Sequence, residues 1–264
     1  MVSRRRLAPG ATVSRVSTPS SAGMASRAET AGPPETDRPA MLFDLDGTLI
    51  DSVYQHVLAW QEALAEFGIE LSVWKIHRRI GMSGGLFVSA LLRETRGSLS
   101  PEQIRDINLA HAAAFGRRRA TVRPLPGAGA LLDLLTDQGV KWAIATSGPA
   151  SAARPALDLL GLTENTPLVT RDQVRHAKPD PDLFIAAAAL VGVEVTDAIV
   201  VGDSIWDLLA ARRAGALGVG LLSGGYGREE LERAGAYRVY ADPADLLDHL
   251  DEVGIRRDSA WPVG

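Results

Sequence analysis

Met41-Leu-Phe-Asp44-Leu-Asp46-Gly-Thr48 is the stretch that decides the fold of this 264-residue chain. An apolar run leads into two acids and a Gly-Thr pair, which is typical of a buried strand that ends in a turn. Side chains alternate along a strand, so we expect Asp44 and Asp46 to point to the same side. Two unpaired carboxylates this close are unfavourable, whereas a divalent cation would use them as ligands. A calcium loop also contains D-x-D-G, but its later acidic positions and closing glutamate are missing here.

After this stretch, the chain shows two different patterns of apolar residues. Residues 53–116 carry apolar positions at helical spacing and no convincing strand, and Ser100-Pro-Glu-Gln103 is typical of a helix start. Beyond residue 124, short apolar strands alternate with helices, which indicates a mostly parallel sheet with helices on both faces. The predicted strands are 140–146, 167–170, 198–201 and 217–222, and the predicted helices are 150–160, 181–191 and 206–214.

We therefore predict an α/β fold: a Rossmann-like, mostly parallel sheet core with an inserted all-helical cap domain. The core is predicted to comprise residues 41–52 and 123–264, and the cap residues 53–122. Residues 1–40, rich in Arg, Ser, Ala and Pro, are interpreted as a disordered or mis-started tail.

Polar residues follow the later strands as well. Ligands of open parallel sheets collect outside the carboxyl ends of the strands. Thr146 and Ser147 end the second predicted strand, with a hydroxyl and backbone amides that suit a phosphate group. Lys178 stands just before a helix that begins with proline. Asp203 ends a buried strand, and Asp207 follows it by four residues on the next helix.

The composition excludes several classes of function. The absence of cysteine removes thiolate zinc sites, thiol catalysis and disulfide scaffolds, and it fits a reducing compartment. The net charge of -4 gives no support for nucleic-acid binding. No apolar run reaches the roughly 18 residues that span a bilayer. We expect a cytoplasmic protein with no membrane partner, although the Arg and Ser bias of residues 1–40 leaves organellar targeting open.

The order of these motifs resembles the haloacid dehalogenase superfamily, over roughly residues 41–222. Asp-x-Asp-Gly-Thr, a strand that ends in Thr, Lys-Pro and Gly-Asp-x-x-x-Asp follow one another in the family's order. The helical insert looks like the type-1 cap of subfamily I. The resemblance implies a Mg²⁺-dependent enzyme that acts on a small phosphorylated metabolite.

The resemblance also implies a role for each residue. Asp44 would be the nucleophile that forms an aspartyl phosphate, and Asp46 the general acid and then the general base. Asp46 needs a raised pKa to act as an acid, and we expect its neighbour Asp44 and a closed cap to provide it. Thr146 and the backbone amide of Ser147 would bind phosphoryl oxygens, while Lys178 would neutralise their charge.

A magnesium site is implied at the same place. Asp44, Asp203 and the main-chain carbonyl of Asp46 would bind Mg²⁺. Asp207 would contribute through water or turn toward Lys178. The acid two residues after the nucleophile marks the phosphoryl-transfer branch of the family and excludes the halide-removing branch.

The substrate-binding residues separate a phosphatase from a mutase. His56, twelve residues after Asp44, lies where β-phosphoglucomutases have a histidine that contacts the general acid, and we assign it to the substrate-binding set. Gly84 stands where those mutases have an arginine, and residues 109–115 lack their lysine. We therefore predict a phosphatase acting on a sugar phosphate or phosphoglycolate-like ester. A β-phosphoglucomutase-type enzyme is the alternative, and a non-catalytic regulatory protein the second alternative.

Overall fold

The protein is described from a computed structural model, which describes residues 38–82, 86–88, 90 and 99–256. All of these residues belong to the compact unit Thr36–Gly264. The predicted tail up to residue 37 and Gly84 of the cap loop lie outside the described residues. The prediction for each of them therefore stays a prediction, as do the domain boundaries.

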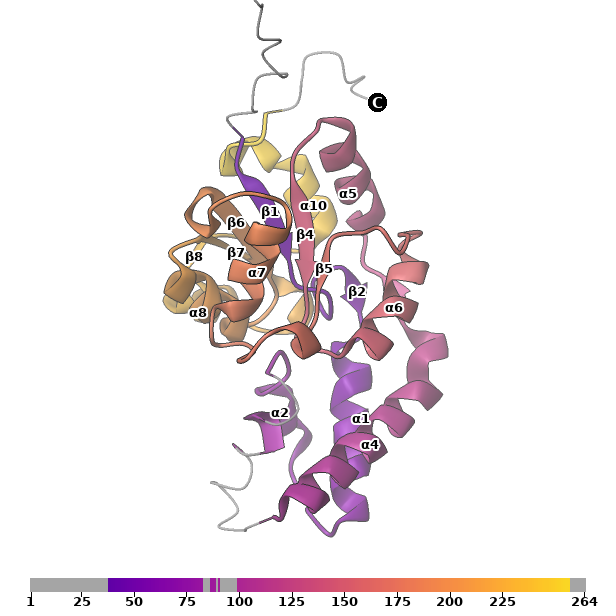
Figure 1. The fold of residues 1–264 in the computed structure, drawn as a ribbon. Helices are drawn as coiled ribbons and strands as arrows, with labels where there is room; N and C mark the ends of the chain where they lie inside the picture. Colours follow the sequence, from indigo (N-terminus) through magenta and orange to yellow (C-terminus); the bar gives the residue numbers. More distant parts are fainter. Residues whose placement is uncertain (1–37, 83–85, 89, 91–98, 257–264) are drawn as a thin grey trace, which may run out of the picture. The chain divides into compact units, whose positions relative to one another are not determined.

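A six-stranded sheet forms the centre of the fold, in the order β5-β4-β1-β6-β7-β8 (Figure 1). All paired neighbours in it are parallel. β1 lies between β4 and β6, and all four of its residues are buried, as an apolar run covered on both faces requires. The strands are β1 (Ala40–Phe43), β4 (Trp142–Ala145), β5 (Leu168–Val169), β6 (Ala198–Gly202), β7 (Leu217–Leu221) and β8 (Ala236–Tyr240).

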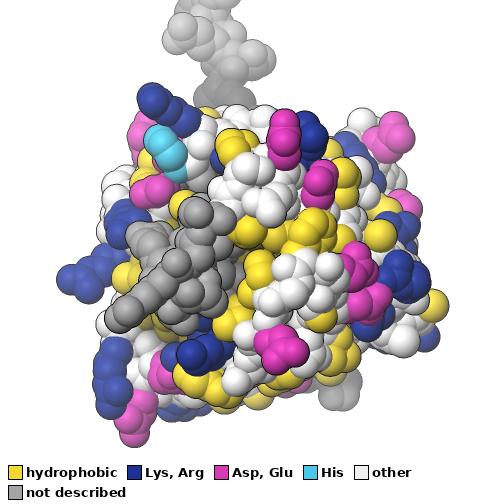
Figure 2. Space-filling model, turned by 90° about the horizontal axis from the view of Figure 1, so that it is seen from below, with side chains coloured by type: hydrophobic (Ala, Val, Ile, Leu, Met, Phe, Trp, Pro, Cys, Tyr) yellow, Lys and Arg dark blue, Asp and Glu magenta, His cyan; other side chains and the backbone are white. Residues whose placement is uncertain are grey.

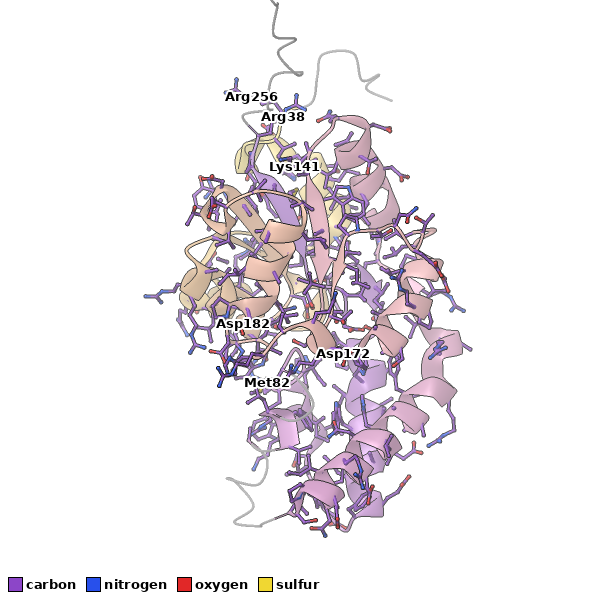
Figure 3. All side chains as sticks on the ribbon, viewed as in Figure 1. Arg38, Met82, Lys141, Asp172, Asp182 and Arg256 are labelled. Carbon is purple, nitrogen blue, oxygen red and sulfur yellow. The ribbon has the colours of Figure 1, made fainter. Side chains whose placement is uncertain are left out.

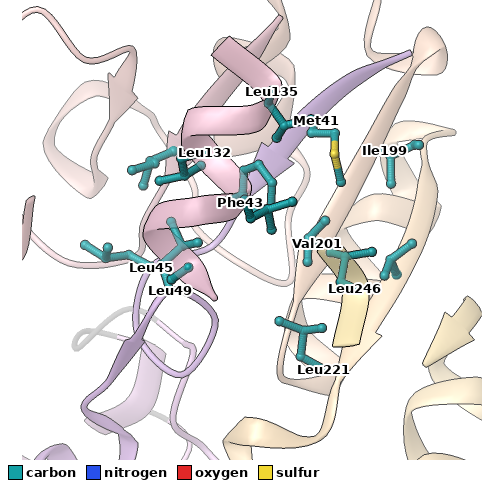
Figure 4. Packing of buried hydrophobic residues seen from close by; sticks show 14 of the residues in the cluster. Met41, Phe43, Leu45, Leu49, Leu132, Leu135, Ile199, Val201, Leu221 and Leu246 are labelled. Carbon is teal, nitrogen blue, oxygen red and sulfur yellow. The ribbon is translucent and has the colours of Figure 1, made fainter. Parts of the chain in front are cut away.

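Alternation along β1 sends its side chains into two apolar layers. Met41 and Phe43 belong to the layer that includes Leu132 of α5 and Leu246 of α10 (Figure 4). Leu42 belongs to the opposite layer, with apolar residues of α7 and α8. Helices therefore cover both faces of the sheet, which confirms the predicted α/β class. The core helices are α5 (Ala128–Asp137), α6 (Ala150–Leu159), α7 (Asp182–Leu190), α8 (Ile205–Ala214), α9 (Arg228–Ala234) and α10 (Pro243–Asp248).

The insert after the first strand is helical where the structure describes it (Figure 1). Its longer helices are α1 (Val53–Glu66), α2 (Val73–His77) and α4 (Pro101–Arg118), and they share an apolar cluster of their own. α4 begins at the predicted capping box. The Ser100 hydroxyl accepts from the Gln103 amide at 3.2 Å, and the Gln103 side chain accepts from the Ser100 amide at 2.9 Å.

A short antiparallel ribbon joins the insert to the core. β2 (Ile50–Asp51) pairs with β3 (Arg123–Pro124), so that Asp51 is the Cα partner of Arg123. Among the described residues, no helix combines the length and hydropathy needed to cross a membrane. The 3-10 turns described are η1 (Arg119–Thr121), η2 (Arg171–Gln173), η3 (Val195–Asp197), η4 (Leu222–Gly224) and η5 (Leu250–Val253).

Candidate active site

Three neighbouring strands end at one place in the core. β1 is followed by Asp44, β4 by Thr146 and β6 by Asp203, and all three of these side chains are buried. The amino ends of the strands lie on the far side of the sheet, where Figure 3 shows Arg38, Lys141 and Arg256. The predicted chemistry therefore collects at the end of the sheet that faces the helical insert.

Asp44, Asp203 and Asp207 form a buried carboxylate cluster. One oxygen of each lies within 4.8 Å of the others. Burial raises the pKa of Asp44 to about 7, a rise that Lys178 opposes and the charges of Asp207 and Asp46 support. Burial also raises the pKa of Asp203 well above its usual range, with the charges of Asp207 and Asp44 adding to the rise. An oxygen-only set of crowded carboxylates fits a hard divalent cation such as Mg²⁺.

The turns around Asp203 leave room for its carboxylate. Thr48 donates its hydroxyl hydrogen to Asp203 Oδ1 at 3.0 Å. A Cβ atom at Gly47 or Gly224 would overlap the Asp203 carboxylate. Gly47 also has a φ of +86°, which favours glycine. The Asp-Gly-Thr motif thus provides both a hydrogen bond to this carboxylate and the space it occupies.

Lys178 is a fully buried amine between two carboxylates. Its Nζ atom contacts Asp44 Oδ1 and lies 2.8 Å from Asp207 Oδ1. Burial alone would lower the pKa of Lys178, but Asp207 and Asp44 outweigh it and keep this pKa raised. The other oxygen of Asp207 accepts hydrogen bonds from the amide and hydroxyl of Ser204 at 3.1 and 2.6 Å. Asp207 therefore turns toward Lys178, one of the two placements that the resemblance implied.

Asp46 is held by donors of its own. The hydroxyl of Ser52 donates to Oδ1 of Asp46 at 2.6 Å, and Nε2 of His56 lies 3.2 Å from the same oxygen. Burial would raise the pKa of Asp46, but the charge and hydrogen bond of His56, with the hydrogen bond of Ser52, lower it below the usual value. The expectation of a raised pKa for Asp46 is therefore wrong for this structure, because it left out the effect of the hydrogen bonds from Ser52 and His56.

Thr146 and Ser147 line the site beside these carboxylates. The Thr146 hydroxyl accepts a hydrogen bond from the Gly148 amide at 3.0 Å. The Ser147 hydroxyl donates to the Gly81 carbonyl of the insert at 2.9 Å. The loop after β4 thus contacts the insert directly, while phosphate binding by Thr146 and by the Ser147 amide stays a prediction.

A cavity of about 430 Å³ lies over the site. Asp44 and Asp46 line it from the core, and α6 contributes apolar wall residues such as Ala152 and Ala156. Sequence reasoning identified His56 in this lining but missed several side chains that join it. The insert residues found only in the structure include Trp60, Arg79, Asn108, His111 and Phe115.

A signal for some of these residues was present in the sequence. Asn108, His111 and Phe115 are spaced by three and four, which places them on one face of α4. Sequence reasoning used residues 109–115 only as a segment without lysine. That face lines the cavity, whereas the buried positions Ile107 and Ala114 pack into the insert.

Comparisons with known proteins agree on one family. A family model described as haloacid dehalogenase-like hydrolase matches residues 39–215. A phosphoglycolate phosphatase of Rhodospirillum rubrum is 36% identical over 220 residues, which cover 80% of this chain and 90% of the relative. Hexitol phosphatase A of Escherichia coli is 33% identical, over 66% of this chain and 78% of the relative.

Solved structures give the same result. A hydrolase from Pseudomonas syringae superposes with a TM-score of 0.81 and 53% identity, over 82% of this chain and 99% of that one. A β-phosphoglucomutase from Clostridium difficile has a TM-score of 0.72 at 21% identity, over 81% of this chain and 96% of that one. The second likeness shows a shared fold only.

Proposed function

Because this chain belongs to the haloacid dehalogenase-like hydrolases and is a phosphatase-type enzyme, we propose that it is a Mg²⁺-dependent phosphatase that forms an aspartyl phosphate on Asp44. One observation carries the proposal. Asp44 lines the cavity, and its Oδ1 contacts buried Lys178 beside the crowded carboxylates of Asp203 and Asp207. The group that accepts the phosphoryl is therefore next to a fixed positive charge and a set of cation ligands.

The magnesium ion would be held by Asp44, Asp203 and the main-chain carbonyl of Asp46. When bound, Mg²⁺ supplies positive charge to the phosphoryl oxygens during transfer. Asp207 would act mainly through Lys178, since its two oxygens already have Lys178 and Ser204 as partners.

Asp44 and Asp46 would divide the chemistry between them. An oxygen of Asp44 bonds to phosphorus as the bond from phosphorus to the leaving oxygen breaks, and Asp46 gives its proton to that oxygen. A water molecule then attacks phosphorus and gives a proton to Asp46, and the bond between Asp44 and phosphorus breaks to release phosphate. The negative charge of a bound phosphate would raise the pKa of Asp46, which is lowered in the structure without substrate.

The substrate would be a small phosphorylated metabolite. The cavity of about 430 Å³ has room for a leaving group of sugar size. The named relatives include phosphatases for phosphoglycolate and for a hexitol phosphate, and we place the substrate in this range. A cytoplasmic location is part of the same proposal, since small phosphorylated metabolites are found in the cytoplasm.

The test is hydrolysis of p-nitrophenyl phosphate with and without Mg²⁺. The variant Asp44→Asn should lose about 10³-fold or more in turnover, because an amide cannot accept the phosphoryl group. The matched control is Asp133→Asn, which changes an exposed acid on α5 and should leave turnover intact. Turnover without metal, or full activity of Asp44→Asn, would contradict the proposal, whereas no turnover by the unaltered protein would favour the non-catalytic alternative.

A sugar phosphomutase is the second candidate, because His56 lies 3.2 Å from Asp46, the contact expected from the mutase resemblance. Incubation with β-glucose 1-phosphate separates the two. A phosphatase releases inorganic phosphate, whereas a mutase accumulates glucose 6-phosphate.

A further inference from the structure

Three side chains from the core and the insert form one line of hydrogen-bonding contacts. Asp46 Oδ1 lies 3.2 Å from Nε2 of His56, and Nδ1 of His56 lies 3.2 Å from Nε2 of His111. Asp46 follows β1, His56 lies on α1 and His111 on α4. A residue of α4 is thus connected to the proposed general acid without touching it.

The donor at the Asp46 end of this line can be assigned. An ionised Asp46 only accepts, and its Oδ1 already receives the Ser52 hydroxyl hydrogen. His56 must therefore carry hydrogen on Nε2 to make the second bond to Oδ1. The other ring nitrogen of His56, Nδ1, faces Nε2 of His111, and one hydrogen between these two nitrogens makes the next bond.

The surroundings of His111 favour this arrangement. Burial, and then the charge of His56, lower the pKa of His111 well below its usual value, so its ring is neutral and carries a single hydrogen. The ring stacks on Trp60 with centroids 4.0 Å apart, and the ring of His56 stacks on Phe115 with centroids 3.8 Å apart. Stacking fixes the plane of each imidazole, so the nitrogens keep facing one another.

We infer that His111 is a positioning residue, which holds the ring of His56 through this hydrogen bond so that Asp46 Oδ1 stays occupied and Oδ2 is the reacting oxygen. The inference rests on the proposed function of Asp46 as general acid. It gives α4 a part in catalysis through a hydrogen bond to His56.

Two variants separate the hydrogen bond from the ring. His111→Phe keeps an aromatic ring for Trp60 but has no hydrogen-bonding atom, while His111→Gln places an amide, which can donate or accept, near the position of Nε2. His249→Phe makes the same change at an exposed histidine on the core and is the control.

The readout is kcat/KM for two Mg²⁺-dependent reactions, on glycerol phosphate and on p-nitrophenyl phosphate. An alkoxide needs a proton to leave, whereas p-nitrophenolate leaves without one. His111→Phe should therefore lose about 10- to 100-fold on glycerol phosphate and stay within about twofold on p-nitrophenyl phosphate. His111→Gln should recover most of the loss. An equal loss on both substrates, no loss on either, or no recovery by His111→Gln would overturn the inference.

Nitrogen-15 NMR of the unaltered protein gives an independent test. One proton should couple to both Nδ1 of His56 and Nε2 of His111 across their hydrogen bond, and the absence of this coupling would overturn the inference even if the variants fail to fold. If the unaltered enzyme hydrolyses neither ester, the proposed function fails, while the coupling measurement still reports on His111.

Discussion

The positive charge of Lys178 stabilises the two buried carboxylates that it contacts. Lys178→Met keeps the apolar stem but removes the positive charge between Asp44 and Asp207. Loss of one partner from a buried ion pair typically costs about 3–5 kcal/mol. We expect a loss of this size in the free energy of unfolding at neutral pH, measured with urea in the absence of metal. Lys141→Met, at an exposed lysine, is the control, and equal stability of the two variants would contradict the prediction.

We expect Gly224 to affect Mg²⁺ affinity because it leaves room for the Asp203 carboxylate. Its φ is not positive, so alanine brings no backbone strain, but the added Cβ would overlap the Asp203 carboxylate. We expect Gly224→Ala to weaken Mg²⁺ binding by about 10- to 100-fold in calorimetric titration, the range typical of disturbed ligand geometry. Gly116→Ala, where a Cβ meets nothing within 4 Å, is the control. Unchanged affinity in Gly224→Ala would show that Asp203 is not a ligand.

The sequence predicts which site residues meet when those residues directly follow a strand. Asp44, Thr146 and Asp203 follow buried apolar strands, and parallel strands end on the same side, so their meeting is predictable. The surroundings of Asp46 were not predictable in the same way. The mutase resemblance predicted the contact of His56, but no pattern indicated Ser52, which reaches Oδ1 because the chain turns back through β2 into α1.

Among the elements, α4 depends on its capping box. Ser100→Ala removes the acceptor for the Gln103 amide and should lower stability by about 1 kcal/mol. Ser72 caps the start of α2 without a side-chain hydrogen bond, so Ser72→Ala is a matched control with a smaller expected effect. Thermal unfolding followed by circular dichroism measures both. A larger loss in Ser72→Ala would contradict the prediction.

Several elements that sequence reasoning missed have physical causes of their own. β8 alternates too little to be recognised, since its first three residues are exposed or half-buried and only its last two are buried. β2 and β3 have two residues each and exist through their mutual pairing, which no local pattern encodes. α10 has only six residues and depends on the Asp242 side chain, which accepts from two backbone amides.

For the whole molecule, metal and pH should act on stability together. Asp44, with a pKa raised to about 7, and Asp203, also raised, hold protons in the folded state that the unfolded chain releases. The stability that these two groups contribute to the metal-free protein is therefore fully present below the ordinary carboxylate range and is lost as the pH rises through about 7. Under the proposed function, Mg²⁺ would bind the ionised carboxylates and so stabilise the folded form. The gain in Tm on adding Mg²⁺ should be larger at pH 8 than at pH 5, and an equal gain would contradict this prediction.

Side chains that contact backbone carbonyl oxygens join the insert to the core. His77 Nε2 lies 2.7 Å from the Gly224 carbonyl, and the Tyr226 hydroxyl donates to the Arg78 carbonyl at 3.0 Å.

Figure 2 shows acidic, basic and apolar side chains interspersed over the described part of the surface seen from below. A mixed surface of this kind gives no single-sign field for a polyanion, which is consistent with a small-molecule partner.

The ribbon of β2 and β3 brings the two ends of the insert next to each other. Asp51 and Arg123 are direct antiparallel partners, so a two-residue turn would span the distance between them. A shortened gene that joins these two positions would keep every strand of the central sheet and its order. The resulting protein would present Asp44 and Asp46 at an open surface, a starting point for engineering dephosphorylation of esters too bulky for the natural cavity.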